Sequence, residues 1–80
     1  MLYKTKEILT DALNRKYGVA YFNATDLHMV RAYIDAAEAL NAPVIIGTSE
    51  GLLDLYGGYE WMAPLMLDAA KRAKVPVAIH

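Results

Sequence analysis

Three polar side chains, Asn23, Ser49 and His80, each come at or just after the end of a short apolar segment. An asparagine amide and a serine hydroxyl can both orient a substrate hydroxyl or phosphate, and a histidine can act as a base or bind a metal. Because the carboxyl ends of parallel strands meet at one edge of a sheet, residues placed in this way would share a rim. The sequence therefore predicts a polar site assembled from strand ends.

Each of these residues also has a purely structural interpretation. Asn23 could bond its own backbone in a turn. Ser49 could cap a short helix, although with the Glu50-Gly51 pair it could also present N–H groups to a phosphate. The nearby glycines match neither a Walker P-loop nor a dinucleotide fingerprint. His80 alone makes no metal site, because nothing near it supplies two further ligands. These residues alone therefore define no catalytic residue and no metal ligand set.

The composition is that of a globular domain, with 56% hydrophobic and 21% charged residues among 80. Eight basic and nine acidic residues are interspersed without a basic face, so nucleic acid is not an expected partner. No apolar run reaches the roughly 18–20 residues of a membrane span, so no membrane partner is expected either. The lack of cysteine and of an apolar leader favours a cytoplasmic location.

The segments that must position the polar residues alternate between helices and strands. Hydrophobic periodicity predicts helices over residues 5–16, 26–40, 52–56 and about 60–73, and apolar runs predict strands over 19–22, 44–46 and 75–79. Thr5 is the expected N-cap of the first helix, and Pro64 requires the last helix to begin near Glu60 or to kink. The order helix, then β-α-β-α-β, predicts parallel strands joined by right-handed crossovers.

Such a unit occurs in the open doubly wound sheet and in the (β/α)₈ barrel. Its strands are apolar without alternation and need cover on both faces, which so few helices hardly supply. A complete barrel needs about 250 residues, so residues 1–80 are predicted to form a single incomplete α/β domain. In a barrel the first helix would close the bottom. Tyr56, Tyr59 and Trp61 are interpreted as a packing cluster over the second crossover, with a subunit contact as the alternative.

Three ordered motifs make the sequence resemble the class II, zinc-dependent fructose-bisphosphate and tagatose-bisphosphate aldolases. The motifs are Gly-Val-Ala-Tyr-Phe-Asn at 18–23, Ala-Pro-Val-Ile-Ile-Gly-Thr-Ser-Glu-Gly at 42–51 and Val-Pro-Val-Ala-Ile-His at 75–80. Those enzymes are TIM (β/α)₈ barrels, so the resemblance implies that this chain forms the first three strands of one, preceded by the bottom-capping helix. Tyr21 is a departure, because the family often has Ala or Gly at that position.

The resemblance also implies roles for individual residues. Asn23 matches an asparagine that contacts the sugar phosphate, and Ser49 matches a serine at the reacting end of the substrate. In the family, strand three continues past the residue matched by His80 into Leu-Asp-His, which holds the acid/base aspartate and a histidine that binds Zn²⁺. His80 is therefore expected near the active site but not on the metal.

The implied reaction is reversible aldol cleavage of a ketose 1,6-bisphosphate to dihydroxyacetone phosphate and glyceraldehyde 3-phosphate. Zn²⁺ would stabilise the enediolate, and a carboxylate would move the proton. Neither the zinc ligands nor that carboxylate is among the residues that match, so the chain alone is expected to be inactive. The groups that distinguish fructose from tagatose bisphosphate are expected later in a barrel.

Two other functions stay possible from the sequence. An α/β unit with unpaired sheet edges could act as an interaction module that associates with copies of itself or with another barrel segment. Residues 49–51 could instead hold an anion in a small phosphate-binding domain. The expected partners are thus a sugar bisphosphate in the full enzyme, and either the remaining barrel segment or a second copy of the chain.

Overall fold

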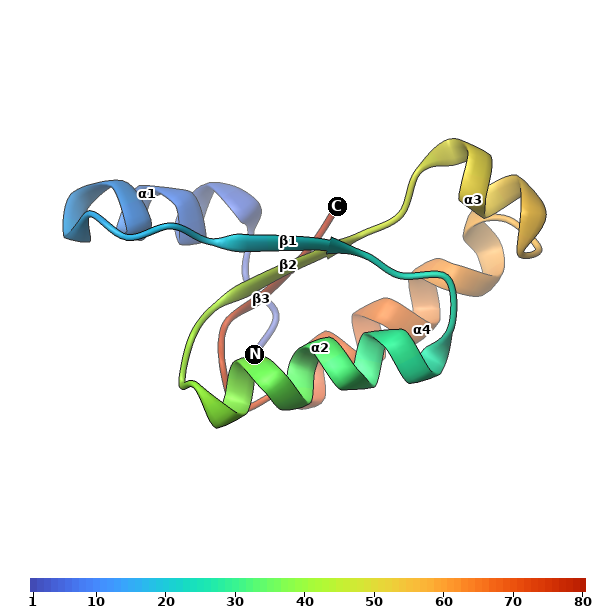
Figure 1. The fold of residues 1–80 in the computed structure, drawn as a ribbon. Coiled ribbons are helices and arrows are strands. Elements are labelled where there is room, and N and C mark those ends of the chain that lie inside the picture. Colours follow the sequence, from blue (N-terminus) through green and yellow to red (C-terminus); the bar gives the residue numbers. More distant parts are fainter.

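The computed structural model describes residues 1–80 as a parallel sheet with helices on both faces (Figure 1). The elements follow in the order α1 (Thr5–Arg15), β1 (Ala20–Asn23), α2 (Leu27–Ala39), β2 (Val44–Gly47), α3 (Glu50–Leu55), α4 (Tyr59–Arg72) and β3 (Val77–Ile79). All strands pair in parallel, in the spatial order β1-β2-β3. The predicted helix followed by a β-α-β-α-β unit is confirmed, with most bounds shifted by one or two residues.

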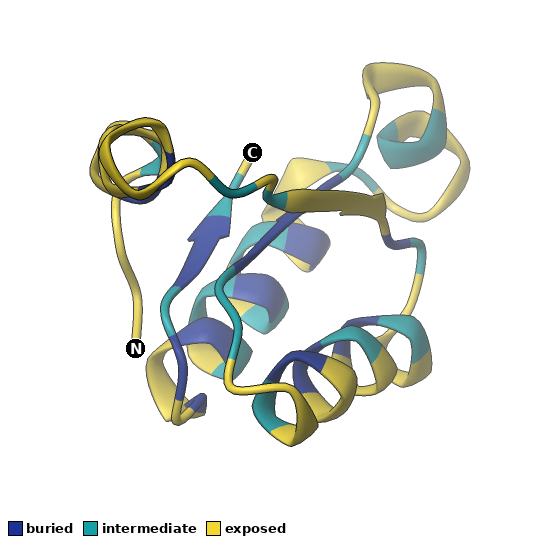
Figure 2. Cartoon of the chain, turned by 60° about the vertical axis from the view of Figure 1, so that its left-hand side comes forward, coloured by how far each residue is buried: buried dark blue, intermediate teal, exposed yellow.

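The strand register assigns every side chain of the sheet to one of two faces. Phe22, Ile46 and Ile79 form one cross-strand row, whereas Tyr21, Ile45 and Ala78 form the row before it. Because successive residues of a strand point to opposite faces, the two rows face opposite sides of the sheet. Helices α2 and α4 cover the first face, and their inner sides are buried (Figure 2).

The two faces are covered unequally. Twelve buried residues form the cluster between the sheet, α2 and α4, and it includes Ile46 and Val77. On the other face, α1 buries only Ile8 and Ala12, and Ile8 packs against Ile45 and Ala78 in a cluster of three buried residues. All four residues of β1 are exposed, whereas all four of β2 are buried. The face that carries α1 is therefore only partly covered.

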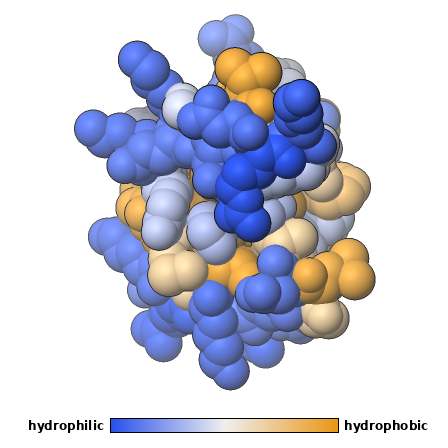
Figure 3. All heavy atoms as spheres, turned by 90° about the vertical axis from the view of Figure 1, so that its left-hand side faces the viewer, coloured by the Kyte–Doolittle hydropathy of each residue, from blue (hydrophilic) through white to orange (hydrophobic).

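Helix α1 lies beside the amino-terminal part of β1, away from the arrowhead of that strand (Figure 1). Viewed from this end, the surface is mostly hydrophilic and is interrupted by a few hydrophobic residues (Figure 3). Helix α3 lies at the opposite end, where the chain leaves β2. On the face of the sheet that carries α1, the uncovered part therefore lies toward the carboxyl ends of the strands.

Local capping contacts explain most of the helix bounds. The Asp26 carboxylate accepts a hydrogen bond from the Met29 N–H at 2.9 Å and begins α2, as the sequence predicts. The predicted cap at Thr5 is wrong, because Thr5 is already the first helical residue and Lys4 occupies the N-cap position. There the Glu7 carboxylate reaches back to the Lys4 N–H at 2.7 Å. Helix α4 begins at Tyr59 and includes Pro64, close to the predicted start.

The chain start adds a pairing that the sequence did not predict. Leu2 forms a parallel bridge with Val77, whose N–H donates to the Met1 carbonyl at 2.8 Å and whose carbonyl accepts from the Tyr3 N–H at 2.9 Å. The Met1 ammonium also donates to the carbonyls of Ala70, Ala73 and Val75 near the end of α4. Residues 1–3 therefore occupy the outer edge of β3 at its first residue.

The predicted aromatic packing cluster is wrong. Tyr56, Tyr59 and Trp61 expose 52%, 70% and 74% of their surface. Gly57 and Gly58 both have positive φ and turn the chain between α3 and α4, and the buried side of α4 then carries Met62, Met66 and Ala70. The longest helix has 14 residues, and no helix of the chain is both long and apolar enough to cross a membrane.

Candidate functional site

Polar side chains gather at the carboxyl ends of β1 and β3, on the face of the sheet that α1 covers only in part. Tyr21 and Asn23 are two residues apart on β1 and therefore point to the same side. His80 comes directly after β3, two residues beyond Ala78, and its N–H donates to the Ile46 carbonyl at 3.0 Å, which continues the strand pairing. The register thus brings the ends of β1 and β3 to either side of β2.

Tyr21 connects the two strand ends. Its hydroxyl donates a hydrogen bond to Asn23 Oδ1 at 3.1 Å and lies 3.5 Å from His80 Nδ1. The Tyr21 and His80 rings meet edge to face, with centroids 5.6 Å apart and planes at 78°. Such an arrangement places the positive edge of one ring on the negative face of the other and is favourable. Asn23, Tyr21 and His80 therefore form one contact cluster, which we call the rim cluster.

Gly47 on β2 makes room for the rim cluster. A Cβ atom at this position would lie 2.3 Å from the Tyr21 hydroxyl oxygen and 2.8 Å from the His80 carbonyl oxygen. Both distances are far below ordinary van der Waals contact, so no side chain fits there without displacing its neighbours. The absence of a side chain at Gly47 is what lets the Tyr21 ring lie across β2 and reach His80.

The backbone of Asn23 is fixed from the other side of the sheet. The Tyr33 hydroxyl of α2 donates to the Asn23 carbonyl at 2.8 Å, and the Tyr33 ring stacks on Phe22 with centroids 4.8 Å apart. The N–H of Ala24 donates to the Gly47 carbonyl at 2.8 Å. The end of β1 is therefore tied to both α2 and β2, and the Asn23 side chain projects from a defined position.

Ser49 lies on the same rim, two residues after Gly47, but its hydroxyl is used locally. Ser49 is the N-cap of α3, and its Oγ accepts a hydrogen bond from the Leu52 N–H at 3.3 Å. It makes no side-chain hydrogen bond to Asn23, Tyr21 or His80. The structure thus brings Asn23 and His80 together through Tyr21 and leaves Ser49 beside them with a capping contact.

The rim cluster consists of an amide, a phenol and an imidazole, all exposed to solvent. These groups can donate and accept hydrogen bonds and can orient a phosphate or a carbonyl oxygen. No group of three or more His, Asp, Glu or Cys side chains comes together anywhere in the chain. His80 is the one good zinc ligand of the rim, so the residues present do not fit a zinc site. The cluster is suited to binding and orientation.

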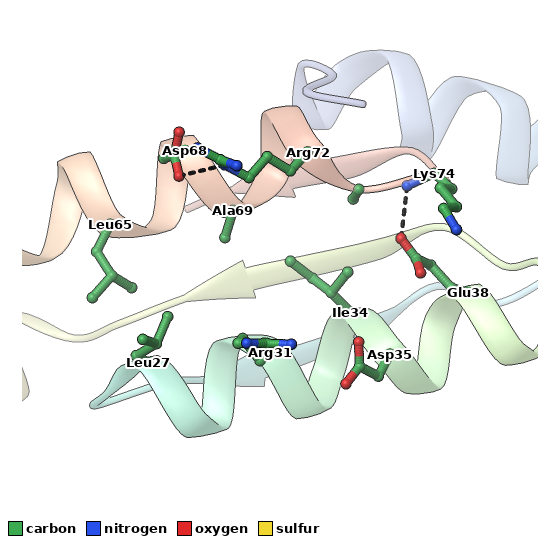
Figure 4. A pocket seen from close by; sticks show the side chains of 11 residues that line it. Leu27, Arg31, Ile34, Asp35, Glu38, Leu65, Asp68, Ala69, Arg72 and Lys74 are labelled. Atoms are coloured by element: carbon green, nitrogen blue, oxygen red, sulfur yellow. Dashed lines mark hydrogen bonds and ion pairs between the residues drawn. The ribbon is translucent and has the colours of Figure 1, made fainter.

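A larger cleft of about 560 Å³ lies on the other side of the molecule, between α2 and α4 (Figure 4). Two of its acidic side chains make hydrogen bonds inside the cleft, one to a backbone N–H and one to an arginine. Glu38 Oε1 accepts from the Lys74 N–H at 2.8 Å, and Arg72 Nε pairs with Asp68 Oδ2 at 2.8 Å. None of the predicted site residues lines it. This cleft is a groove between two helices and is not the candidate site.

A second cavity of about 320 Å³ is mostly apolar and adjoins the rim on the β3 side. Thr48, Ile79 and His80 contribute from the sheet, and Met62 and Met66 from α4. The cavity therefore lies where α3 and α4 meet the ends of β2 and β3.

A parallel βαβαβ sheet whose crossover helices lie on one face has the arrangement of a segment of a (β/α)₈ barrel. The comparisons agree with this class. The chain aligns over its whole length with the crystal structure of the YdjI aldolase from Escherichia coli K12, with a TM-score of 0.91, 35% identity and 31% of that chain covered.

The chain belongs to the class II fructose-bisphosphate aldolase family. The family model described as fructose-bisphosphate aldolase class-II matches residues 3–80. A fructose-bisphosphate aldolase of Geobacillus stearothermophilus is 40% identical over 99% of this chain, and a 6-phospho-5-dehydro-2-deoxy-D-gluconate aldolase of Halalkalibacterium halodurans is 36% identical over 99%. The chain spans 28% of the length of each of these relatives.

Asn23, Ser49 and His80 are predicted from the sequence, whereas Tyr21 has no predicted role there and only departs from the family pattern. A signal was present, because two-residue alternation along a strand places Tyr21 on the same face as Asn23. What the sequence did not contain was the register that puts Gly47 beneath the Tyr21 ring.

Proposed function

We propose that this chain supplies the first three strands and part of the substrate site of a class II aldolase that cleaves a ketose 1,6-bisphosphate reversibly. The observation that carries the proposal is the match of the whole chain to about 30% of an aldolase barrel, in sequence and in structure. The products would be dihydroxyacetone phosphate and glyceraldehyde 3-phosphate. The Halalkalibacterium relative is named for a different phosphorylated substrate, so the feature shared by these substrates is a phosphorylated sugar skeleton.

In this proposal Asn23 and Ser49 contact the substrate, and His80 lies beside the reacting centre. The Asn23 amide would donate hydrogen bonds to a substrate oxygen from its position at the end of β1. Ser49 would contact substrate through its exposed hydroxyl, which already accepts a bond from Leu52 and still has its own proton to donate. The Zn²⁺ ligands and the acid/base carboxylate would be supplied by residues outside 1–80, and the bound metal would polarise a substrate oxygen.

The remaining barrel is the partner that this proposal requires. β1 is exposed along its length, and the large apolar side chains of Leu13, Leu40 and Leu55 are more than three-quarters exposed. Further β/α units placed against β1 and β3 would cover these surfaces and both sheet edges. Self-association of the chain is the alternative, and the same exposed apolar surface favours it. Light scattering on the purified chain separates the two, because self-association gives a defined oligomer.

The test is a grafted aldolase, in which residues 1–80 replace the matching segment of the Geobacillus stearothermophilus enzyme. We expect this protein to cleave fructose 1,6-bisphosphate in the presence of Zn²⁺, and the 80-residue chain alone to be inactive. Asn23→Ala should weaken substrate binding in the graft. A grafted protein with native circular dichroism but no cleavage of fructose or tagatose bisphosphate would contradict the proposal, as would cleavage by the isolated chain.

A further inference from the structure

Tyr21 is placed to control the orientation of a neighbouring side chain. An asparagine amide can rotate by about 180° and exchange its oxygen for its NH₂ group, so its donors point to a ligand only if something fixes it. In this structure the Tyr21 hydroxyl donates to Asn23 Oδ1 at 3.1 Å. If the amide were turned over, its NH₂ group would donate to the phenolic oxygen, and the phenolic proton would then have only His80 Nδ1 as an acceptor, at the longer distance of 3.5 Å.

The Tyr21 hydroxyl is itself held in place. Gly47 leaves the space in which the ring lies, and the His80 ring closes it from the β3 side at a centroid distance of 5.6 Å. Because the single phenolic proton goes to Asn23, the phenolic oxygen can accept a bond from His80 Nδ1, 3.5 Å away, when that nitrogen carries its proton. The three strand ends thereby hold one another through a single side chain.

We infer that Tyr21 is a positioning residue, which fixes the Asn23 amide with its oxygen toward the phenol and its two N–H donors toward the mouth of the barrel. This inference rests on the proposed function, because it assigns those donors to an anionic or carbonyl oxygen of a phosphorylated sugar. Tyr21 does not touch the reacting atoms. It acts on substrate binding through Asn23.

The functional test is a double-mutant cycle in the grafted aldolase. Tyr21→Phe removes only the hydroxyl and should raise KM for the bisphosphate about five- to tenfold, the usual effect of one hydrogen bond, with kcat changed less than about twofold. In the Asn23→Ala background the same change should have no further effect on KM, because the residue through which Tyr21 acts is gone. An equal rise in KM in both backgrounds would overturn the inference.

The contact itself has a readout that needs no activity. The chain has only three asparagines, Asn14, Asn23 and Asn41, so ¹⁵N-asparagine labelling of the 80-residue protein gives three side-chain amide pairs, and Asn23→Ala identifies one of them. Tyr21→Phe should shift that pair and leave the other two in place. Tyr56→Phe is the matched control, because the Tyr56 ring is exposed and Tyr56 is far from Asn23 in the sequence.

The two measurements separate the possible failures. An Asn23 amide signal that is unmoved by Tyr21→Phe overturns the inference, whatever the activity of the graft. The grafted protein could instead be folded but inactive, while the amide signal shifts as expected. That result would contradict the proposed function, and Tyr21 would still be the residue that orients Asn23.

Discussion

Replacing Gly47 with alanine should destabilise the chain strongly, although it adds only one methyl group. The new Cβ would lie 2.3 Å from the Tyr21 hydroxyl oxygen, 2.7 Å from the adjoining ring carbon and 2.8 Å from the His80 carbonyl oxygen. Ordinary contact begins near 3.4 Å, so the ring must move by about 1 Å or more. The His80 carbonyl is backbone that accepts from the Thr48 N–H and cannot move without disturbing the end of β3.

The expected cost follows from two terms. Overpacking at a well-packed position costs about 1–3 kcal/mol. Displacing Tyr21 also breaks its hydrogen bond to Asn23, which contributes about 0.5–1.5 kcal/mol. Together these give a loss of about 2–4 kcal/mol, a large part of the roughly 4–12 kcal/mol typical of a domain of this size.

The assay is urea unfolding of the chain followed by circular dichroism. Gly18→Ala is the matched control, because no atom lies within 4 Å of a Cβ at that position, and it should be neutral or stabilising by about 0.5 kcal/mol. Adding Tyr21→Ala to Gly47→Ala should restore part of the lost stability, since it removes two of the three close contacts. Equal stability of Gly47→Ala and wild type would refute the placement of Tyr21 over β2.

Three further changes test other parts of the fold. Asp26→Ala removes the α2 N-cap and should cost about 1 kcal/mol in urea unfolding, whereas an unchanged midpoint would contradict the capping bond. Ile46→Ala should cost about 2–5 kcal/mol, and more than Ile45→Ala, because Ile46 belongs to the twelve-residue cluster and Ile45 to the three-residue one. Burial lowers the pKa of the Met1 ammonium below its ordinary 8.0, and attraction to Glu38 opposes this in part. The unfolded chain then holds that proton more tightly, so unfolding free energy should rise as the pH approaches 8.0 from below and level off above it. Nα-acetylation should abolish this slope, and a slope that survives it would assign the effect to other groups.

The sequence predicted the elements and their order because each is encoded locally. Asp26 caps a helix whose apolar residues recur with helical periodicity, and the apolar run before Gly47 is typical of a buried strand. The parallel order then follows from the handedness of crossovers. The contacts at the rim could not be predicted in the same way. Whether Tyr21 reaches His80 depends on two registers, that between β1 and β2 and that between β2 and β3, and on the space above one glycine.

Other failures have the same origin. Trp61 is exposed because the buried stripe of α4 runs through Met62, Met66 and Ala70, and only the packing against the sheet selects that stripe. The pairing of Leu2 with Val77 joins two segments far apart in the sequence, and no local pattern indicates it. The Ser49 hydroxyl caps α3, which is one of the two interpretations that the sequence allows, and its contact with a substrate stays a prediction.

The solvent exposure of the rim cluster explains why these strands would orient a substrate without binding it tightly. Asn23 donates from a site open to water, where each bond to a phosphate oxygen replaces a bond to solvent and contributes little. In a closed barrel the same amide would act in a site of lower dielectric, in which hydrogen bonds to charge are much stronger. Asn23→Ala should therefore change phosphate binding by the isolated chain hardly at all, while in the grafted aldolase it should weaken sugar bisphosphate binding about tenfold or more, as measured by calorimetry. Equal losses in the two proteins would mean that Asn23 acts on the fold of the strand end and not on the ligand.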